Sequence, residues 1–182
     1  MKILAIVGSR NAEGMTATAT KSLLKGAQAA GAEVETVFLP WKNIERCRQC
    51  DDSGWGICRT TGNCVIEDDF AHLVNAIRSS DRIVLATPVY FSDLSESMKA
   101  FLDRLRRIGM HEKGKDGIEA KVAVAICVAG GGGGGAPQCA CIMDRILRTC
   151  GFDLVETIPV RRQNLDLKKS LLETTGGWLA SS

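Results

Sequence analysis

Five short apolar segments alternate with longer segments of helical character along this chain, and this alternation limits the folds that it can adopt. Short segments with few polar side chains are typical of strands that are covered on both faces. They lie at Lys2–Gly8, Val34–Leu39, Arg82–Ala86, Lys121–Val128 and, more weakly, Asp153–Ile158. Because strand–helix–strand alternation produces parallel strands joined by right-handed crossovers, we expect an α/β fold with a five-stranded parallel sheet and helices on both faces.

The segments between the strands have the spacing of amphipathic helices. In one of them, four apolar side chains recur at intervals of three and four residues, which places them on one helix face. These are Phe70, Leu73, Val74 and Ile77. Helices are predicted at Thr16–Gly31, Asp68–Ser79, Ser95–Ile108 and Pro137–Cys150. In the tail, residues 160–182, a helix at Leu165–Leu179 either closes the core of its own chain or packs on a neighbouring subunit.

Length and charge narrow the class of protein. A chain of 182 residues is enough for one domain with a full core and thin for two, so residues 1–182 are expected to form a single domain. The formal net charge of +2 gives no indication of a nucleic-acid or membrane partner. The basic residues Arg104, Arg106 and Arg107 are expected to form a solvated helix face.

The amino-terminal segment and the apolar runs bear on location. The first apolar run is too short for a signal peptide, and no run reaches the ~18 residues of a transmembrane helix. A cytoplasmic location is therefore expected. Thiols stay reduced there, which makes disulfides the least expected use of the eight cysteines.

The loop after the first predicted strand has the features of a phosphate-binding turn. A strand–loop–helix turn aims free backbone N–H groups and the positive end of the helix dipole at one place. The loop lacks the lysine of nucleoside-triphosphate-binding loops and the G-x-G-x-x-G pattern of dinucleotide-binding ones. The alternative is a tight turn with Thr16 as helix cap. The candidate binding residues are Ser9, Arg10, Asn11, Gly14, Met15, Thr16 and Ala17.

The loops after the third and fourth strands reach the same sheet edge, where open parallel sheets bind ligands. Tyr90 and Phe91 suit a flat ring system, unless Phe91 is buried as a lid on the core. The six glycines Gly130–Gly135 suit a partner that approaches the main chain closely; otherwise they form a flexible loop. The candidate residues here are Pro88, Val89, Tyr90, Phe91, Ser95, Ala129, Gly130 and Gly131.

An insertion at residues 40–66 contains four cysteines in the pattern C-x2-C-x7-C-x5-C. Four reduced thiols can bind an iron–sulfur cluster or a zinc ion, although only the first two are spaced like a zinc knuckle. The loop could also bind no metal. It leaves the second strand at the carboxyl edge of the sheet, which favours a redox role. The candidate ligands are Cys47, Cys50, Cys58 and Cys64.

The remaining cysteines fall outside the insertion. Cys127 lies in a predicted buried strand and Cys150 at a helix end, so both are expected to be packing residues. Cys139 and Cys141 lie near the start of a predicted helix, where the dipole lowers the pKa of a thiol. They are therefore either reactive or simply packed.

Several of these motifs resemble those of the NADPH-dependent FMN reductase superfamily. They are GSRNAEGMT, TPVYFSDLSESMKAFLDR and the glycine loop, while the insertion and CVIEDDF resemble the iron–sulfur flavoprotein branch. The resemblance implies a flavodoxin-like fold with strand order 2-1-3-4-5. It also implies FMN phosphate at Ser9–Ala17, the isoalloxazine against Pro88–Phe91 and the strand-four loop, and a 4Fe-4S cluster on the four cysteines.

Two departures from the family pattern are visible. The family often has G-S-P-R in its first loop, whereas Arg10 directly follows Ser9 here. The branch usually has two residues between its second and third cysteines, whereas Asp51–Ile57 provides seven.

The function expected is that of an FMN-dependent oxidoreductase or electron-transfer flavoprotein that passes single electrons between FMN and the cluster. A small redox protein such as ferredoxin, or NAD(P)H, is the expected partner, and a homodimer or homotetramer the expected assembly. One alternative is an NAD(P)H-dependent FMN or quinone reductase without a cluster. Another is a zinc-stabilised flavodoxin-like binding module.

Overall fold

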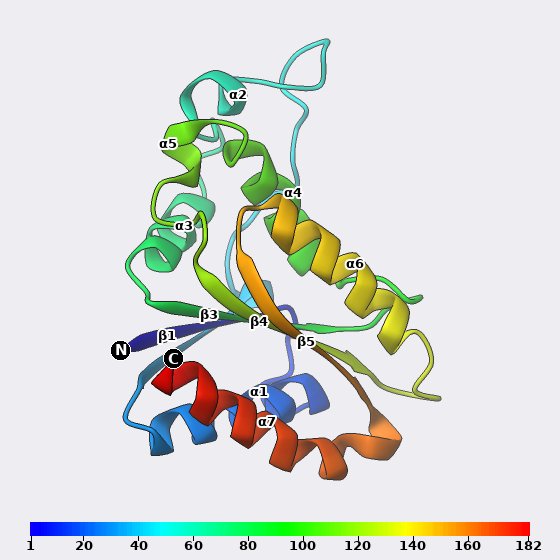
Figure 1. Ribbon diagram of the computed structural model, residues 1–182. Coiled ribbons are helices and arrows are strands. Elements are labelled where there is room, and N and C mark those ends of the chain that lie inside the picture. The colour runs from blue at the N-terminus through cyan, green and yellow to red at the C-terminus, as the bar shows by residue number, and fades with distance from the viewer.

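A computed structural model describes all residues, 1–182, and shows one five-stranded parallel sheet with helices on both faces (Figure 1). The strands are β1 Lys2–Val7, β2 Glu33–Phe38, β3 Arg82–Pro88, β4 Val122–Ala129 and β5 Asp153–Arg161. The main helices are α1 Met15–Ala29, α3 Phe70–Arg78, α4 Glu96–Ile108, α6 Ala136–Thr149 and α7 Leu165–Ser181. The short ones are η1 Leu39–Trp41, α2 Cys58–Thr61, α5 Glu112–Lys115 and η2 Arg162–Asn164.

The strand order is β2-β1-β3-β4-β5, as expected, with every neighbouring pair parallel. This is the flavodoxin-like order, in which successive connections run in opposite directions from β1 and leave a switch point between β1 and β3. β5 is longer than its apolar segment indicated and ends at Arg161. The four short helices are not predictable from the sequence, because three or four residues carry no measurable periodicity.

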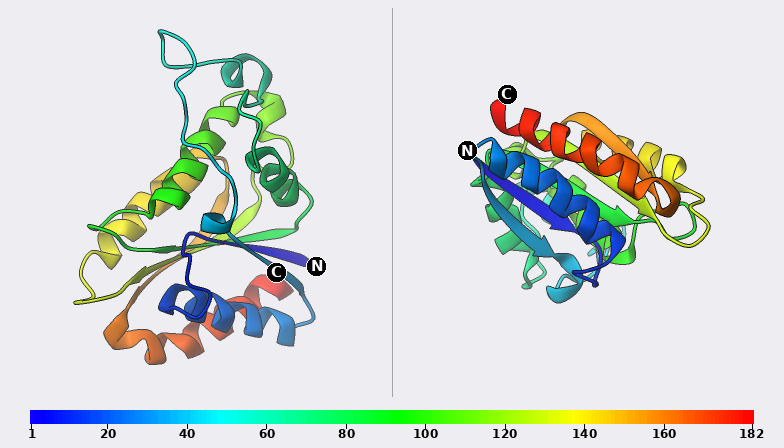
Figure 2. Two further views of the ribbon diagram at one scale, coloured as in Figure 1. Left: turned by 180° about the vertical axis from the view of Figure 1, so that it is seen from behind. Right: turned by 90° about the horizontal axis from the view of Figure 1, so that it is seen from below.

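Helices cover both faces of the sheet (Figures 1 and 2), and a separate hydrophobic core lies on each face. The face covered by α3, α4 and α6 contains the larger core, in which Phe70, Phe101 and Met143 are buried. The opposite face is covered by α1 and α7, with Leu23 and Leu172 buried between them and the sheet. Burial on both faces explains why the inner strands β1, β3 and β4 are mainly apolar, whereas the edge strands β2 and β5 also carry exposed polar side chains.

The tail helix α7 packs against α1 of its own chain, and Figure 2 shows the two helices side by side under the sheet. The contact is close because glycines face it from both sides. A Cβ at Gly26 would collide with the Glu173 carbonyl, and one at Gly176 with the Leu23 carbonyl. Of the two alternatives for the tail, the structure therefore supports closure of its own core.

No helix combines the length and the apolar composition that a bilayer-spanning helix requires.

Replacement of Gly176 by alanine is expected to destabilise the fold by about 1–3 kcal/mol, because the added methyl group forces α7 away from α1. Gly177→Ala is the matched control, since the nearest atom to its Cβ would be the Gly26 carbonyl oxygen at 3.7 Å. That variant is expected to be neutral or slightly more stable, because alanine favours a helix. Urea unfolding of the two variants measures the difference, and equal stability would contradict the packing described.

Candidate functional site

The loop between β1 and α1 presents an uncapped helix N-terminus. Gly14 is the N-cap residue, no side chain caps the helix, and its first turn holds no acidic residue. Asn11 shapes the loop: its side-chain oxygen accepts from the Glu13 amide at 2.9 Å and its carbonyl from the Gly14 amide at 3.1 Å. Thr16 lies inside the helix and is not its cap. The free N–H groups of this turn and the positive end of the dipole suit an anion.

The loop after β3 makes a tight turn from Tyr90 to Asp93, closed by backbone hydrogen bonds of 2.9 and 3.0 Å between these two residues. Phe91 and Ser92, at the centre of the turn, have φ values of 49° and 67°. Residues other than glycine and asparagine rarely adopt such values. The turn leaves Phe91 fully exposed and Tyr90 53% exposed. The alternative in which Phe91 is a buried lid on the core is therefore wrong.

The glycine loop after β4 uses its glycines in two ways. Gly131, Gly133 and Gly135 have positive φ values, and a Cβ at Gly135 would also strike Ser92. A Cβ at Gly132 or Gly134 would meet no neighbouring side chain or backbone within 4 Å, so these two glycines face open space. The loop is held in place by a hydrogen bond from the side-chain amide of Gln163 to the Gly132 carbonyl at 3.0 Å.

These three loops surround one cavity of about 500 Å³ at the carboxyl edge of the sheet. That volume is within the usual range for small-molecule and cofactor sites. Most of the predicted binding residues line it: Ser9, Asn11, Gly14, Met15, Thr16, Pro88, Val89, Tyr90, Ala129, Gly130 and Gly131. Val128 and Gly134 also line it and were not predicted. Gly134 belongs to the glycine run that the sequence marks out, whereas Val128 is indistinguishable in sequence from the buried strand that precedes it.

Four predicted residues do not line the cavity: Arg10, Ala17, Phe91 and Ser95. Arg10 and Phe91 are exposed, and Ala17 is buried in α1. Ser95 is buried, and its hydroxyl accepts from the Met98 amide at the start of α4. Thr87 also bonds to Ser95, through the Ser95 amide at 3.0 Å, so this serine has a structural role.

The cysteine insertion leaves the carboxyl end of β2 but does not stay there. None of its residues lines the 500 Å³ cavity. Figures 1 and 2 show that α2 lies near the carboxyl-terminal end of α4. The loops that frame the cavity lie near the other end of that helix. The helix α2, which contains Cys58, therefore lies away from the carboxyl edge of the sheet where the cavity is found. The reason is docking on α4, which carries the segment away from that edge.

Two arginines of α4 hold the insertion. Arg107 donates to the Gly54 carbonyl at 2.6 Å and stacks on the ring of Trp55, 4.7 Å from its centroid. Arg104 forms an ion pair with Asp68 in which both side chains are buried, at 1% and 0% exposure. Trp55 therefore packs against arginines rather than the core, with Arg59 on it as well at 5.3 Å.

The expectation of a solvated arginine face is wrong for Arg104. This residue is three positions after Phe101 and four before Ile108, both of them buried, so its spacing places it on the apolar face of α4. Burial alone would lower the pKa of Arg104, but hydrogen bonds to Asp68 and Cys64 outweigh it and the pKa is raised. Burial likewise acts to raise the pKa of Asp68, yet hydrogen bonds from Arg104 and two backbone amides lower it.

The four insertion cysteines are free thiols, but no three Cys, His, Asp or Glu side chains converge as a metal ion would require. Cys50 and Cys58 both lie against Gly56: a Cβ there would be 3.3 Å from the Cys50 sulfur, and the Cys58 sulfur is 3.7 Å from its carbonyl. The sulfur of Cys64 accepts from Arg104 at 3.3 Å.

The donor set fits an iron–sulfur cluster in its chemistry, since it offers four thiols. It fits a single zinc ion less well, because zinc needs all its sulfurs within about 2.3 Å of one point. A cluster has inorganic iron and sulfide between its thiolates and accepts a wider spread of sulfurs. The thiols do not form a closed ligand set as they stand.

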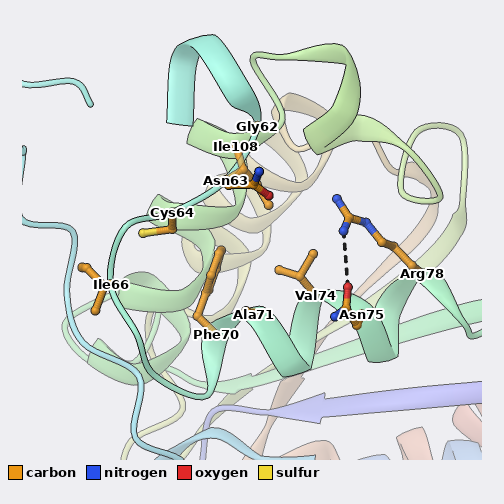
Figure 3. A pocket seen from close by; sticks show the side chains of 10 residues that line it. All are labelled: Gly62, Asn63, Cys64, Ile66, Phe70, Ala71, Val74, Asn75, Arg78 and Ile108. Carbon is orange, nitrogen blue, oxygen red and sulfur yellow. Dashed lines mark hydrogen bonds between the residues drawn. The ribbon is translucent and has the colours of Figure 1, made fainter. Parts of the chain in front are cut away.

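A smaller cavity of about 140 Å³ lies beside the insertion, between α3 and the end of α4 (Figure 3). Figure 3 shows the sulfur of Cys64 pointing away from Val74 and Arg78, which line the other side. Arg78 bonds to Asn75 and to the carbonyls of Lys113 and Asp116, so its donors serve the α5 loop.

The cysteines outside the insertion have packing roles, with one exception. Cys127, Cys139 and Cys150 are buried, while Cys141 is exposed. The hydrogen bond from the Cys127 thiol to Cys139, together with burial, raises the pKa of Cys127 strongly, and burial raises the pKa of Cys150 to about 12. Among the two thiols considered for reactivity, only Cys141 is accessible.

Comparison with known proteins gives consistent matches. Residues 1–144 match the family described as NADPH-dependent FMN reductase. An iron–sulfur flavoprotein of Archaeoglobus fulgidus is 32% identical over 178 residues, which is 93% of this chain and 76% of that protein. An iron–sulfur flavoprotein of Methanosarcina thermophila is 34% identical over 129 residues, 67% of this chain and 63% of that protein.

Among solved structures, the NAD(P)H:quinone oxidoreductase of Methanothermobacter marburgensis superimposes with a TM-score of 0.71 at 18% identity. The match covers 97% of this chain and 94% of that one. At this identity the likeness shows the fold alone. The family match spans the phosphate loop, the aromatic turn and the glycine loop, which are the three walls of the cavity. The chain therefore belongs to the NADPH-dependent FMN reductase family, a family of flavin-dependent oxidoreductases.

Proposed function

We propose that this protein is an FMN-dependent oxidoreductase whose cofactor binds in the cavity at the carboxyl edge of the sheet. The observation that carries the proposal is the meeting of three loops, distant in sequence, around one cavity of suitable volume. Family membership supports FMN as the cofactor. When bound, FMN supplies the redox chemistry, because its ring takes up and releases electrons.

The residues divide the work of binding. The uncapped turn at Gly14–Thr16 would hold the phosphate through backbone N–H groups and the Thr16 hydroxyl. Tyr90, half exposed at the rim, would cover part of the ring system. The backbone of the glycine loop would approach the ring edge, where N–H groups can stabilise the negative charge of the reduced form. With Arg10 off the cavity, the helix N-terminus is the main source of positive potential there.

We also propose that the cysteine insertion binds a 4Fe-4S cluster and that the protein acts in electron transfer. Two observations support this: the four free thiols on one segment, and the similarity to relatives named iron–sulfur flavoproteins. Because the thiols do not converge as they stand, binding requires the insertion to close around the cluster.

A second candidate is an NAD(P)H-dependent flavin or quinone reductase without a cluster. The open cavity favours it, since nothing in this chain covers the half-exposed Tyr90 and a flat substrate could stack there. The similar fold of a protein named NAD(P)H:quinone oxidoreductase is compatible with it.

Replacement of Gly134 by valine is expected to weaken FMN binding about tenfold, or ~1.4 kcal/mol, because the side chain takes up cavity space. Gly132→Val is the matched control: both positions have room for a Cβ and no positive φ, but only Gly134 lines the cavity. Flavin fluorescence titration of deflavinated protein measures both dissociation constants. Equal effects of the two substitutions would contradict the proposed site.

Protein purified without oxygen is expected to contain about four iron and four sulfide ions per chain. In Cys58→Ser both contents are expected to fall sharply, because a ligand is lost. Cys141→Ser, which alters an exposed cysteine outside the insertion, is the control and should retain them. Zinc without sulfide in the wild type would support the zinc-stabilised alternative, and no metal at all would refute the cluster.

The electron donor separates the two redox candidates. For the electron-transfer function, chemically reduced ferredoxin is expected to bleach the flavin absorbance of FMN-loaded protein faster than NADPH does. Stopped-flow spectroscopy without oxygen measures both rates. Faster bleaching by NADPH would favour the reductase instead.

A further inference from the structure

Arg104 donates hydrogen bonds to three different residues from inside the protein. One terminal nitrogen, Nη1, donates to Asp68 Oδ2 at 2.6 Å and to the Glu45 carbonyl at 3.1 Å. The other, Nη2, donates to Asp68 Oδ1 at 3.0 Å and to the sulfur of Cys64 at 3.3 Å. The face of the guanidinium lies 4.2 Å from the centroid of the Phe70 ring. Asp68 neutralises the buried charge, and the Glu45 carbonyl and the Cys64 sulfur accept from guanidinium N–H groups that the carboxylate leaves available.

These partners stand at the two ends of the cysteine insertion. Glu45 precedes the first cysteine, while Cys64 is the last and Asp68 follows it. Asp68 also links the two ends of the insertion directly, because its carboxylate accepts from the backbone amide of Glu45 at 2.8 Å and from that of Phe70 at 3.1 Å. One buried ion pair thus joins the entry and the exit of the segment that contains all four candidate ligands.

The contact with Cys64 determines where that sulfur points. In Figure 3 the thiol is directed away from the small cavity, and its hydrogen-bond donor is Arg104. A charged donor to a ligand sulfur stabilises the more negative, reduced state of a cluster and so raises its reduction potential. The same donor reduces the freedom of Cys64 before any cluster is present.

We propose that Arg104 is the positioning residue of the cysteine insertion: it fixes Cys64 as a preset ligand and raises the reduction potential of the group that Cys64 binds. The second part of this inference rests on the proposed cluster, and the first does not. The role requires an arginine, because its planar fork serves the carboxylate, the carbonyl and the sulfur together, whereas a lysine offers a single nitrogen.

The test compares Arg104→Lys and Arg104→Gln with Arg106→Gln. Arg106 lies on the same helix, is partly exposed and pairs only with Asp103, so it controls for loss of an α4 arginine. Near-ultraviolet circular dichroism verifies folding. Arg104→Lys retains the charge beside Asp68, so a folded variant is available even if Arg104→Gln unfolds.

The first measurement needs no metal. Metal-free protein is alkylated with iodoacetamide, and modification of Cys64 relative to Cys50 is followed by peptide mass spectrometry. Cys64 is expected to react several-fold faster in folded Arg104→Lys than in the wild type or Arg106→Gln, because the sulfur is released. An unchanged ratio overturns the positioning role.

The second measurement uses anaerobically reconstituted protein and an EPR-monitored redox titration. In Arg104→Lys the one-electron reduction equilibrium is expected to shift about tenfold towards the oxidised state, ~59 mV. Loss of iron from the folded Arg104→Lys variant also supports the inference. An iron content and a reduction potential equal to those of Arg106→Gln overturn its second part. A wild type without iron instead refutes the proposed cluster, and the alkylation result then decides the positioning role alone.

Discussion

The direction of the strands governs most of this structure. Because all five strands are parallel, their carboxyl ends meet at one edge, and the change of winding direction between β1 and β3 separates the loops that follow them. The cavity lies at this edge, between the loops that follow β1, β3 and β4. The sequences of these loops fit that place: an uncapped helix start, an aromatic turn and a run of glycines.

The periodic parts of the fold could be predicted from the sequence, whereas the docking of the insertion could not. Strands and long helices repeat a hydrophobic pattern, and the loop residues at the cavity follow from strand direction. The solvated-face prediction fails for Arg104 because three arginines close together indicate such a face, yet the spacing of Arg104 from Phe101 and Ile108 places it inside. Its partner Asp68 is 36 residues away, and no local pattern links the two.

The proposed flavin site and the cysteine insertion are therefore different kinds of feature. The first is built from the ends of sheet strands and is determined by the topology. The second is an addition held on α4 by Arg104 and Arg107, and its course depends on a few buried polar contacts. A buried ion pair gives little net stability but is costly to break, which suits a contact that selects one placement of a loop.

The packing of α7 on α1 has a consequence for the order in which the chain folds. A chain is synthesised from its amino terminus, so α7 is the last of these helices to become available for packing. The core under α3, α4 and α6 needs no residue beyond β5, but the core on the other face lacks Leu172 and Leu179 until α7 has been synthesised. Until then the side of α1 that α7 covers, which includes Gly26, is open to water and to chaperones.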